Sequence, residues 1–368
     1  MNYQYFTSES VASGHPDKIC DQVSDAVVDA ALKIYPGSRV AVETLVTKDR
    51  LVMAGEVTCP QNLPFEEIAR KVIKDLGYIN EIYNFSYKSP MSFYIHEQSP
   101  DISRGVDTGG AGDQGMMFGF ASTETPELMP LPIILAHRIV EQVDKLKKTK
   151  LKYLRPDGKS EVKIRYEKGI PKLIEKIIIA VPHNPDVSIM EVKKDLIHFV
   201  IKPIIKQYKL NLPKMKDIIL NGTGRWEIGG PAADTGVTGR KIIVDSYGAM
   251  ARHGGGAFSG KDPTKVDRSG AYAARFLAKN IVAAKMADRA EVQIAYVIGQ
   301  IEPIAKAIET FGTQKVDKKK IEKFAWSLLD LSVPGIIRGL KLNRPIYQKT
   351  ACYGHFGRNE FPWEKVIH

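Results

Sequence analysis

Cysteine is scarce in this chain, and long apolar runs are missing. The 368 residues include three cysteines, Cys20, Cys59 and Cys352. Their odd number and wide spacing favour neither a disulfide framework nor a zinc cluster, and they fit a reducing cytoplasm. No run of about 18 apolar residues occurs, so the sequence predicts no membrane span. Residues Met1 to Glu9 lack the basic and apolar segments of a signal peptide.

Acidic residues are outnumbered, and the formal net charge is +11. Such a balance suits a basic RNA-binding protein, which is the non-enzyme alternative for this chain. The surplus is lysine scattered along the sequence, however, as in Asp144 to Lys152 and Lys315 to Lys323. No stripe of interleaved aromatic residues and no nucleic-acid-binding motif accompanies it. Solvated lysine faces are therefore the preferred interpretation, and no nucleic-acid partner is expected.

The hydrophobic content of 43% is typical of globular proteins, and the length suggests two or three domains. Apolar periodicity predicts a helix over Asp17 to Leu32, in which Asp21, Asp25 and Asp29 lie apart from the apolar face. Two β-branched runs, Arg39 to Thr47 and Leu51 to Thr58, predict a hairpin. A second helix is predicted over Phe65 to Leu76, ending at Gly77.

The order of strand and helix recurs twice in the rest of the chain. Lys172 to Val181 is predicted as a strand, followed by a helix over Ile189 to Ile205 despite Pro203. Ala290 to Gly299 is predicted as a strand, followed by a helix over Pro303 to Phe311. The pattern predicts three α+β units, each with helices packed on a mainly antiparallel sheet.

A glycine-rich segment, Gly254 to Arg268, places bare backbone, cations and carboxylates before a predicted helix. Glycine lets main-chain N–H groups approach an anion, and a helix start favours negative charge. Lysine adds a point charge for phosphate, and aspartate can hold Mg²⁺ through oxygen. This composition is typical of a polyphosphate–magnesium site.

Part of this segment, Gly255 to Lys261, also fits the start of a Walker A loop. The next residue of that motif is Ser or Thr, whereas this chain has Asp262 followed by Pro263. Aspartate caps helices and proline suits their first position, so the helix is expected to begin at Pro263. The alternatives are a P-loop-like ATPase or kinase, and an ordinary capped glycine loop.

A second candidate site precedes the first predicted helix. There Gly14, His15, Pro16, Asp17 and Lys18 form a helix start where an anion and an Asp-held Mg²⁺ are favourable. His15 could donate a hydrogen bond or a proton to a developing oxyanion. A helix cap with a surface histidine is the alternative.

Further glycine-rich segments are less specific. Gly110 to Gly115 fits G-x-G-x-x-G, but it follows a polar segment, Ile95 to Thr108, that is predicted to be a loop. A dinucleotide-binding site is therefore not expected. Trp226 could stack on an adenine or fill a core. Arg240 and Lys241 are expected to open a strand over Ile242 to Val244 and could direct charge at phosphates.

Taken together, the motifs resemble those of the S-adenosylmethionine synthetase family. The resemblance rests on Gly14 to Lys18, Gly109 to Gly115 and Gly254 to Pro263, with support from Glu97 to Ile102 and Tyr353 to Arg358. It extends over almost the whole chain. Asp144 to Arg155 matches least. Trp226 replaces the phenylalanine more usual at its position, which should keep stacking but alter the width of the pocket.

The resemblance implies three pseudo-threefold-related α+β domains, expected at residues 1–100, 101–226 and 227–368 with chain crossings between them. Residues 98–108 would form a flexible active-site loop. The implied reaction transfers the adenosyl group of ATP to the sulfur of L-methionine and cleaves the triphosphate to pyrophosphate and phosphate. The implied cofactors are two Mg²⁺ and one K⁺ per site. The implied assembly is a cytoplasmic homodimer with shared active sites, often paired into a tetramer.

Carried over position by position, the resemblance assigns roles to individual residues. The catalytic group is His15, Lys159, Lys261 and Lys265. The ATP contacts are His15, Asp157, Lys159, Arg225, Trp226, Asp234, Arg240, Lys241, Ala257 and Lys261. The methionine contacts are Glu56, Gln98, Asp234 and Lys265. The Mg²⁺ ligands are Asp17 and Asp267, and the K⁺ ligand is Glu43.

Overall fold

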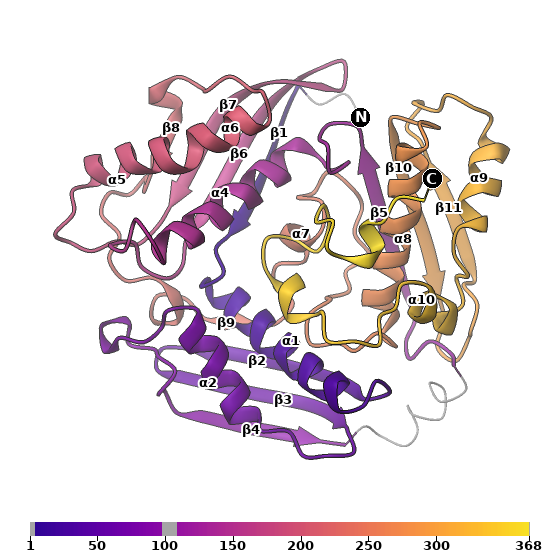
Figure 1. Ribbon diagram of the computed structural model, residues 1–368, viewed down its shortest axis with the longest axis horizontal. Helices are drawn as coiled ribbons and strands as arrows, with labels where there is room; N and C mark the ends of the chain where they lie inside the picture. Colours follow the sequence, from indigo (N-terminus) through magenta and orange to yellow (C-terminus); the bar gives the residue numbers. More distant parts are fainter. Residues whose placement is uncertain (1–3, 98–108, 368) are drawn as a thin grey trace.

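The computed structural model describes residues 4–97 and 109–367 and contains three β-sheets (Figure 1). All neighbouring strands are antiparallel except β3–β4 and β7–β8. The first sheet has the order β4 (Met91–His96), β3 (Arg50–Thr58), β2 (Arg39–Thr47), β9 (Gly236–Val237). The second has the order β1 (Tyr5–Val11), β6 (Lys159–Glu167), β7 (Ile170–Ala180), β8 (Ile218–Leu220). The third has the order β11 (Ala305–Glu309), β10 (Arg289–Tyr296), β5 (Gly115–Ser122).

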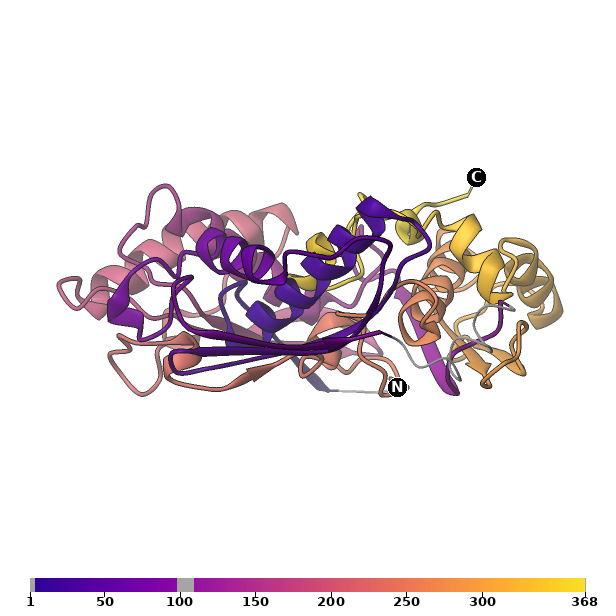
Figure 2. The same cartoon turned by 90° about the horizontal axis from the view of Figure 1, so that it is seen from below.

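One long helix packs on each sheet. Helix α1 (Pro16–Ile34) contacts β2, α4 (Leu131–Lys147) contacts β1 and β6, and α8 (Val266–Ala283) contacts β5 and β10. Helix α2 (Phe65–Asp75) lies beside α1 on the same face of the first sheet (Figure 2). The three helix-on-sheet units confirm the predicted α+β class.

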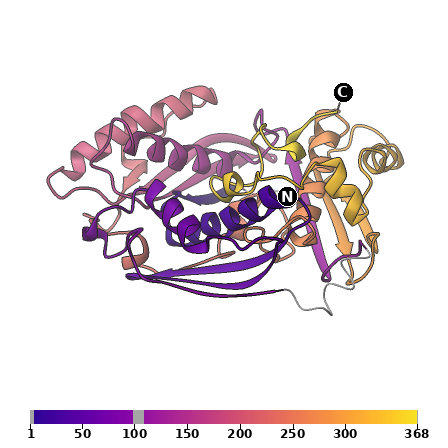
Figure 3. The same ribbon diagram turned by 60° about the horizontal axis from the view of Figure 1, so that its bottom comes forward.

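Each sheet includes a strand from a distant part of the chain. The N-terminal strand β1 pairs with β6, β5 pairs with β10, and β9 pairs with β2. Helix α1 is also covered by η5 (Gln348–Ala351), near the C-terminus (Figure 3). Because of these crossings, one continuous hydrophobic core extends through all three units.

The remaining elements are short. They are η1 (Glu81–Tyr83), α5 (Ile189–Leu196), η2 (Ile197–Ile201), α6 (Lys202–Gln207), η3 (Met215–Asp217), η4 (Gly230–Ala232), α7 (Ile242–Asp245), α9 (Lys318–Ser327), α10 (Val333–Gly339) and η6 (Pro362–Glu364). The predicted helix over Ile189 to Ile205 is confirmed as the run α5–η2–α6. A π turn, η2, precedes Pro203, which falls in the first turn of α6, where a missing N–H is tolerated.

The helix predicted over Pro303 to Phe311 is wrong, because this segment forms strand β11 against β10. Ile304 and Ile308 have helical spacing, but Ile304 is 62% exposed and Ile308 is buried. An amphipathic helix would need both side chains on its covered face. As a strand, the segment supplies the hydrogen-bond partners for the backbone groups at the edge of β10. The loop predicted over Ile95 to Thr108 is wrong at Ile95 and His96, which lie in β4, and residues 98–108 of that prediction lie outside the described residues.

Two predictions beside the candidate sites also need correction. The strand predicted over Ile242 to Val244 is the helical turn α7, in which the N–H of Asp245 donates to the carbonyl of Lys241. Helix α8 begins at Val266, and Pro263 lies before it. Asp262 caps the preceding turn by accepting from the N–H of Thr264 at 2.9 Å.

Candidate functional site

The first candidate site is built at the N-terminus of α1. His15 is the N-cap residue, with extended backbone, and Pro16 occupies the first helical position. The Nδ1 atom of His15 accepts from the N–H of Asp17 at 3.2 Å. Because Nδ1 is an acceptor, the ring proton lies on Nε2, which leaves His15 a neutral hydrogen-bond donor.

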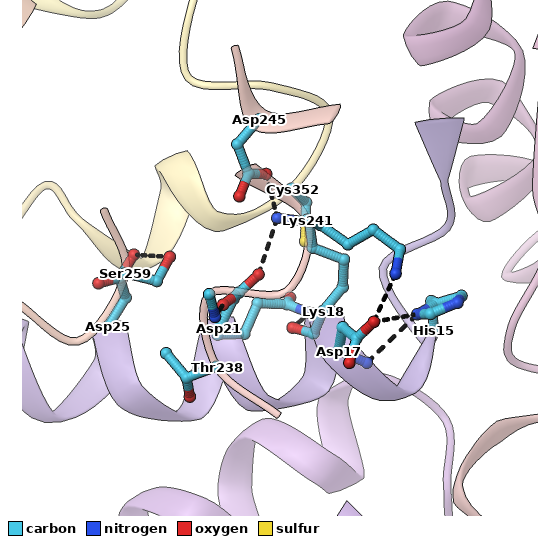
Figure 4. Close-up of polar contacts among 12 residues, drawn as sticks. His15, Asp17, Lys18, Asp21, Asp25, Thr238, Lys241, Asp245, Ser259 and Cys352 are labelled. Carbon is cyan, nitrogen blue, oxygen red and sulfur yellow. Dashed lines mark hydrogen bonds and ion pairs between the residues drawn. The ribbon is translucent and has the colours of Figure 1, made fainter. Parts of the chain in front are cut away.

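Asp17 is buried and accepts two bonds from another part of the chain, of which Figure 4 shows the one from Lys241. Its Oδ1 accepts from the N–H of Val237 at 2.9 Å, and its Oδ2 accepts from Nζ of Lys241 at 2.5 Å. Burial raises the pKa of Asp17, but the hydrogen bonds from Lys241 and Val237 outweigh it and leave the pKa lowered. The carboxylate is therefore ionised and faces a cation.

His15 is 2% exposed, and its pKa is lowered to about 3. The main cause is burial, followed by the positive charges of Lys241 and Lys159. His15 is thus neutral at physiological pH, and two site lysines act on it electrostatically. It can donate a hydrogen bond through Nε2 but cannot serve as a ready source of a proton.

The segment that carries the predicted ATP contacts Asp157 and Lys159 lies beside this helix start. An ideal Cβ on Gly14 would lie 2.8 Å from the backbone nitrogen of Asp157, so the two segments touch. Asp157 is buried and accepts from the N–H groups of Gly158 and Gly230 at 2.6 and 2.7 Å. Burial raises its pKa. Lys159 follows at the start of β6, where its side chain is exposed.

The second candidate site lies before α8. Lys261 contacts Asp267 at 2.6 Å, and their side chains are 23% and 27% exposed. Burial and the neighbouring charge of Glu56 raise the pKa of Glu43, and Lys261 partly offsets this effect. Glu56 in turn lies 3.2 Å from Nε2 of His96. Lys261, Asp267, Glu43 and Glu56 thus belong to one charged neighbourhood.

The glycine segment before α8 does not form the expected backbone cradle at two of its positions. The N–H of Gly260 donates to Oδ1 of Asp25 at 2.9 Å, and that of Gly255 donates to Nδ1 of His253 at 2.8 Å. Neither donor is available to an anion in this conformation. The side chains of Lys261 and Lys265 remain as groups of this segment that can meet a phosphate, which departs from a P-loop.

The residues expected near adenine lie on the 221–241 segment. Trp226 is half-buried, and its Nε1 donates to the carbonyl of Ile228 at 2.8 Å. Its ring and Oδ2 of Asp157 both lie 2.9 Å from an ideal Cβ on Gly229, so Trp226 adjoins the first site. Arg225 pairs with Glu227 at 3.0 Å, and Asp234 is exposed.

The loops of the two sites approach each other. Arg240 lies 3.8 Å from Asp17, and an ideal Cβ on the preceding Gly239 would lie 2.6 Å from that of Ala257. Lys265 contacts Asp262 at 2.5 Å. Gln98, the remaining predicted methionine contact, lies outside the described residues.

The carboxylates suit Mg²⁺ that is held partly by substrate. Among residues 4–97 and 109–367, no group of three or more His, Cys, Asp and Glu side chains could hold a metal ion. Mg²⁺ commonly takes one or two protein carboxylates and completes its shell with water and phosphate oxygens. Asp17 and Asp267, each neutralised by a lysine here, fit this role.

Sequence reasoning missed a buried ionic cluster behind the first site. Lys18 is fully buried and contacts Asp245 and, at 2.9 Å, Asp21. Burial lowers the pKa of Lys18, but both carboxylates outweigh it and leave the pKa raised. The four-residue spacing of the aspartates on α1 was the available signal, because a repeated carboxylate on one helix face needs repeated partners.

The fold and the charged loops define an α+β protein of three units with cations gathered at two helix starts. Comparison with protein families matches all three units. The N-terminal domain of S-adenosylmethionine synthetase matches residues 3–100, its central domain residues 108–226, and its C-terminal domain residues 228–365.

Close relatives cover almost the whole chain. The S-adenosylmethionine synthase of Roseiflexus castenholzii is 52% identical over 98% of this chain and 94% of its own length. That of Treponema denticola is also 52% identical, over 98% of this chain and 96% of its own length. The chain therefore belongs to the S-adenosylmethionine synthetase family, which favours the adenosyltransferase interpretation over a P-loop ATPase or kinase. Among the described residues, no helix is long and apolar enough to cross a membrane.

Proposed function

We propose that this chain joins L-methionine to ATP through a site built from the starts of α1 and α8. As a member of its family it is a methionine adenosyltransferase, which transfers the adenosyl group of ATP to the methionine sulfur and cleaves the triphosphate to pyrophosphate and phosphate. The observation that carries the site proposal is the contact of the partly exposed Lys241 with the buried pair His15 and Asp17.

The chemistry needs charge stabilisation and no activated nucleophile. A thioether has no proton to lose, and the bond to break joins C5′ of the ribose to the triphosphate. Negative charge grows on the leaving oxygen, and fixed cations lower the barrier by meeting it there. In this proposal Lys159, Lys241, Lys261 and Lys265 bind the triphosphate, and the neutral His15 donates Nε2–H to the departing oxygen.

The metal assignment follows the same carboxylates. Asp17 and Asp267 would hold two Mg²⁺, which neutralise the triphosphate when bound. Glu43 would hold K⁺, and its neighbour Glu56 adds a second negative charge that favours a cation there. On the protein side, each aspartate would exchange its lysine partner for the metal, while that lysine turns to a phosphate oxygen.

The substrate ends are assigned to the flanking residues. Arg225, Trp226, Asp157, Asp234, Arg240 and Ala257 would contact ATP. Glu56, Gln98, Asp234 and Lys265 would contact methionine. Trp226 offers an aromatic plane for adenine, although its Nε1–H is already used within the chain.

A homodimer with shared sites, paired into a tetramer, is the assembly we propose. Large apolar side chains point outward from the sheets, with Tyr94 on β4 66% exposed and Met116 on β5 52% exposed. Exposed apolar groups on sheet faces favour a second copy as cover. We further propose that the chain works in the cytoplasm and that its domains divide near residues 100 and 226.

One incubation tests the function. The protein is mixed with ATP, L-methionine, Mg²⁺ and K⁺, and the products are identified by mass spectrometry. We expect the sulfonium product with pyrophosphate and phosphate. Formation of ADP would instead indicate an ATPase or kinase, and strongly salt-dependent RNA binding without turnover would indicate a nucleic-acid partner.

A further inference from the structure

Four aspartates along α1 each accept hydrogen bonds from the backbone of a distant segment. Asp17, Asp21, Asp25 and Asp29 follow each other at four-residue spacing, which places them on one helix face. Each accepts at least one backbone N–H from a segment more than 200 residues away. The donors are Val237 for Asp17, Gly239 for Asp21, Gly260 for Asp25, and Tyr347 with Gln348 for Asp29.

The two middle members hold the turns that carry the proposed triphosphate cations (Figure 4). Oδ1 of Asp21 accepts from the N–H of Gly239 at 2.8 Å, and Arg240 and Lys241 follow directly. Oδ1 of Asp25 accepts from the N–H of Gly260 at 2.9 Å, and Lys261 follows directly. One rigid helix thus sets the positions of both loops.

Both carboxylates also use their second oxygen. Oδ2 of Asp21 accepts from Nζ of Lys18 at 2.9 Å. Asp25 forms a two-pronged pair with Arg268 at 2.6 and 2.8 Å, and its Oδ2 also accepts from Ser259 at 3.0 Å. Arg268 returns to the same loop by donating to the carbonyl of Lys261 at 3.0 Å.

Neither residue can reach a substrate. Asp21 and Asp25 are both 0% exposed, and every one of these hydrogen bonds is made within the protein. Their cationic partners Lys18 and Arg268 are equally buried. Any effect of these aspartates on catalysis must therefore act through the loops.

We propose that Asp21 and Asp25 are positioning residues that fix Lys241 and Lys261 at the spacing a tripolyphosphate requires. This inference rests on the proposed function of those lysines. Helix α1 provides a rigid support, and carboxylates on two successive turns bind the backbone of the two loops that carry the lysines. Sites held within fractions of an ångström by such supporting bonds stabilise charge without reorganisation.

Asp21→Asn is the discriminating variant. An amide has one acceptor oxygen, whereas two donors face the two oxygens of Asp21. The variant must give up either Gly239 or Lys18, and Lys18 keeps Asp245 as its partner. Asp29→Asn is the matched control, since it makes the same change on the same helix at the segment 347–348, to which no site role is assigned.

Three measurements separate positioning from stability. They are the thermal midpoint, kcat and KM for each substrate, and the binding of inorganic tripolyphosphate with Mg²⁺ by calorimetry. For Asp21→Asn we expect tripolyphosphate affinity and kcat to fall roughly ten- to hundredfold, with the KM for methionine little changed. For Asp29→Asn we expect a similar loss of thermal stability but near-normal tripolyphosphate affinity and kcat.

Ser259→Ala tests the Asp25 side with every ion pair intact, in case Asp21→Asn does not fold. It removes one hydrogen bond to Asp25, and we expect tripolyphosphate affinity to fall about threefold. Ser38→Ala, which removes a buried hydroxyl bond to the carbonyl of Ala31 on the same helix, is its control.

Equal effects of Asp21→Asn and Asp29→Asn on kcat and tripolyphosphate affinity would overturn the proposal, as would unchanged affinity in Ser259→Ala. Failure of the proposed function looks different. The wild-type protein would then make no sulfonium product, whereas the tripolyphosphate comparison would still report whether the aspartates order the two loops.

Discussion

The starts of α1 and α8 carry similar sequences but differ in how they are enclosed. Both join a glycine to a lysine or histidine, a proline and an aspartate, and both place an aspartate in the first turn. At α1 the Asp17 side chain is 3% exposed and accepts from two distant partners. At α8 the Asp267 side chain is 27% exposed and paired with Lys261.

This difference indicates a division of labour between a fixed half and an adaptable half of the proposed site. A partly exposed ion pair contributes little to stability, so opening Lys261–Asp267 for a metal and a phosphate costs little. In the α1 half Lys241 would leave Asp17 for a phosphate, but the backbone bonds from Val237 to Asp17 and from Gly239 to Asp21 would still hold the loop in place. The adaptable half at α8 would bind the metal and the phosphate charge, and the fixed half at α1 would set the position at which they bind.

The largest effect is expected at the adaptable half. Lys261→Met removes a charge aimed at phosphate, and we expect kcat to fall about a hundred- to a thousandfold. Because its ion pair is partly exposed, the thermal midpoint should change little. Steady-state kinetics and calorimetry measure both effects. Lys315→Met, which breaks a half-exposed pair with Asp288, is the control, and near-normal turnover of Lys261→Met would remove this residue from the site.

At the fixed half, we expect the largest effect on stability from the close backbone contact between Gly236 on β9 and Pro16 on α1. An ideal Cβ on Gly236 would lie 2.2 Å from the carbonyl carbon of Pro16, so Gly236→Ala must push β9 away from α1. We expect a loss of about 1–3 kcal/mol in the free energy of unfolding, together with reduced turnover. Denaturant unfolding measures the first.

The control for that variant is Gly222→Ala, whose new Cβ would meet Ile219 at an ordinary 3.7 Å. If both alanine variants unfolded at the same denaturant concentration, the close packing of β9 on α1 would not be a source of rigidity, and the contrast between the two halves would weaken.

The enclosure of His15 should appear in the dependence of stability on pH. Its folded-state pKa is lowered from 6.5 to about 3, so the unfolded chain binds more protons between these values. Stability is therefore expected to fall as pH drops below about 6.5. His15→Asn keeps an N-cap acceptor but cannot titrate, so its thermal midpoint should fall less between pH 7 and pH 4.5.

The pKa values of buried His137 and His355 are also lowered. Wild type and His15→Asn therefore both lose some stability in acid through these two residues. The comparison is therefore the difference in slope between wild type and variant. Parallel curves would mean that His15 is not held neutral by the fold.

The smallest effect is expected at an ion pair with no enclosure. Lys71 and Asp75 on α2 are 76% and 57% exposed and lie 2.6 Å apart. We expect Lys71→Met to change the free energy of unfolding by less than about 0.5 kcal/mol. Thermal unfolding at low and high salt checks this value, and a larger loss would show that partial exposure is a poor guide to the cost of opening Lys261–Asp267.

Local patterns predicted the parts of the fold that depend on local chemistry. The helix of α1, the β2–β3 hairpin and the α5–α6 run follow from periodicity and turn residues and are confirmed. The helix predicted for the segment that forms β11 is wrong, because its spacing fits a helix equally well and only the open edge of β10 decides.

The candidate site was harder to read from the sequence. Asp21 and Asp25 lie apart from the apolar face of the predicted helix, yet both are fully buried. Their donors lie more than 200 residues away, and no local pattern indicates which backbone N–H groups will face a helix. The residue roles themselves came from the resemblance of motifs and stay predictions.

Each sheet contains a strand from a remote part of the chain, and this arrangement limits where the chain can be cut into fragments that fold. A fragment that ends after residue 100 would lack β9, and one that begins after β1 would expose the edge of β6. Limited proteolysis or a split gene should therefore yield pieces that fold only when they are recombined.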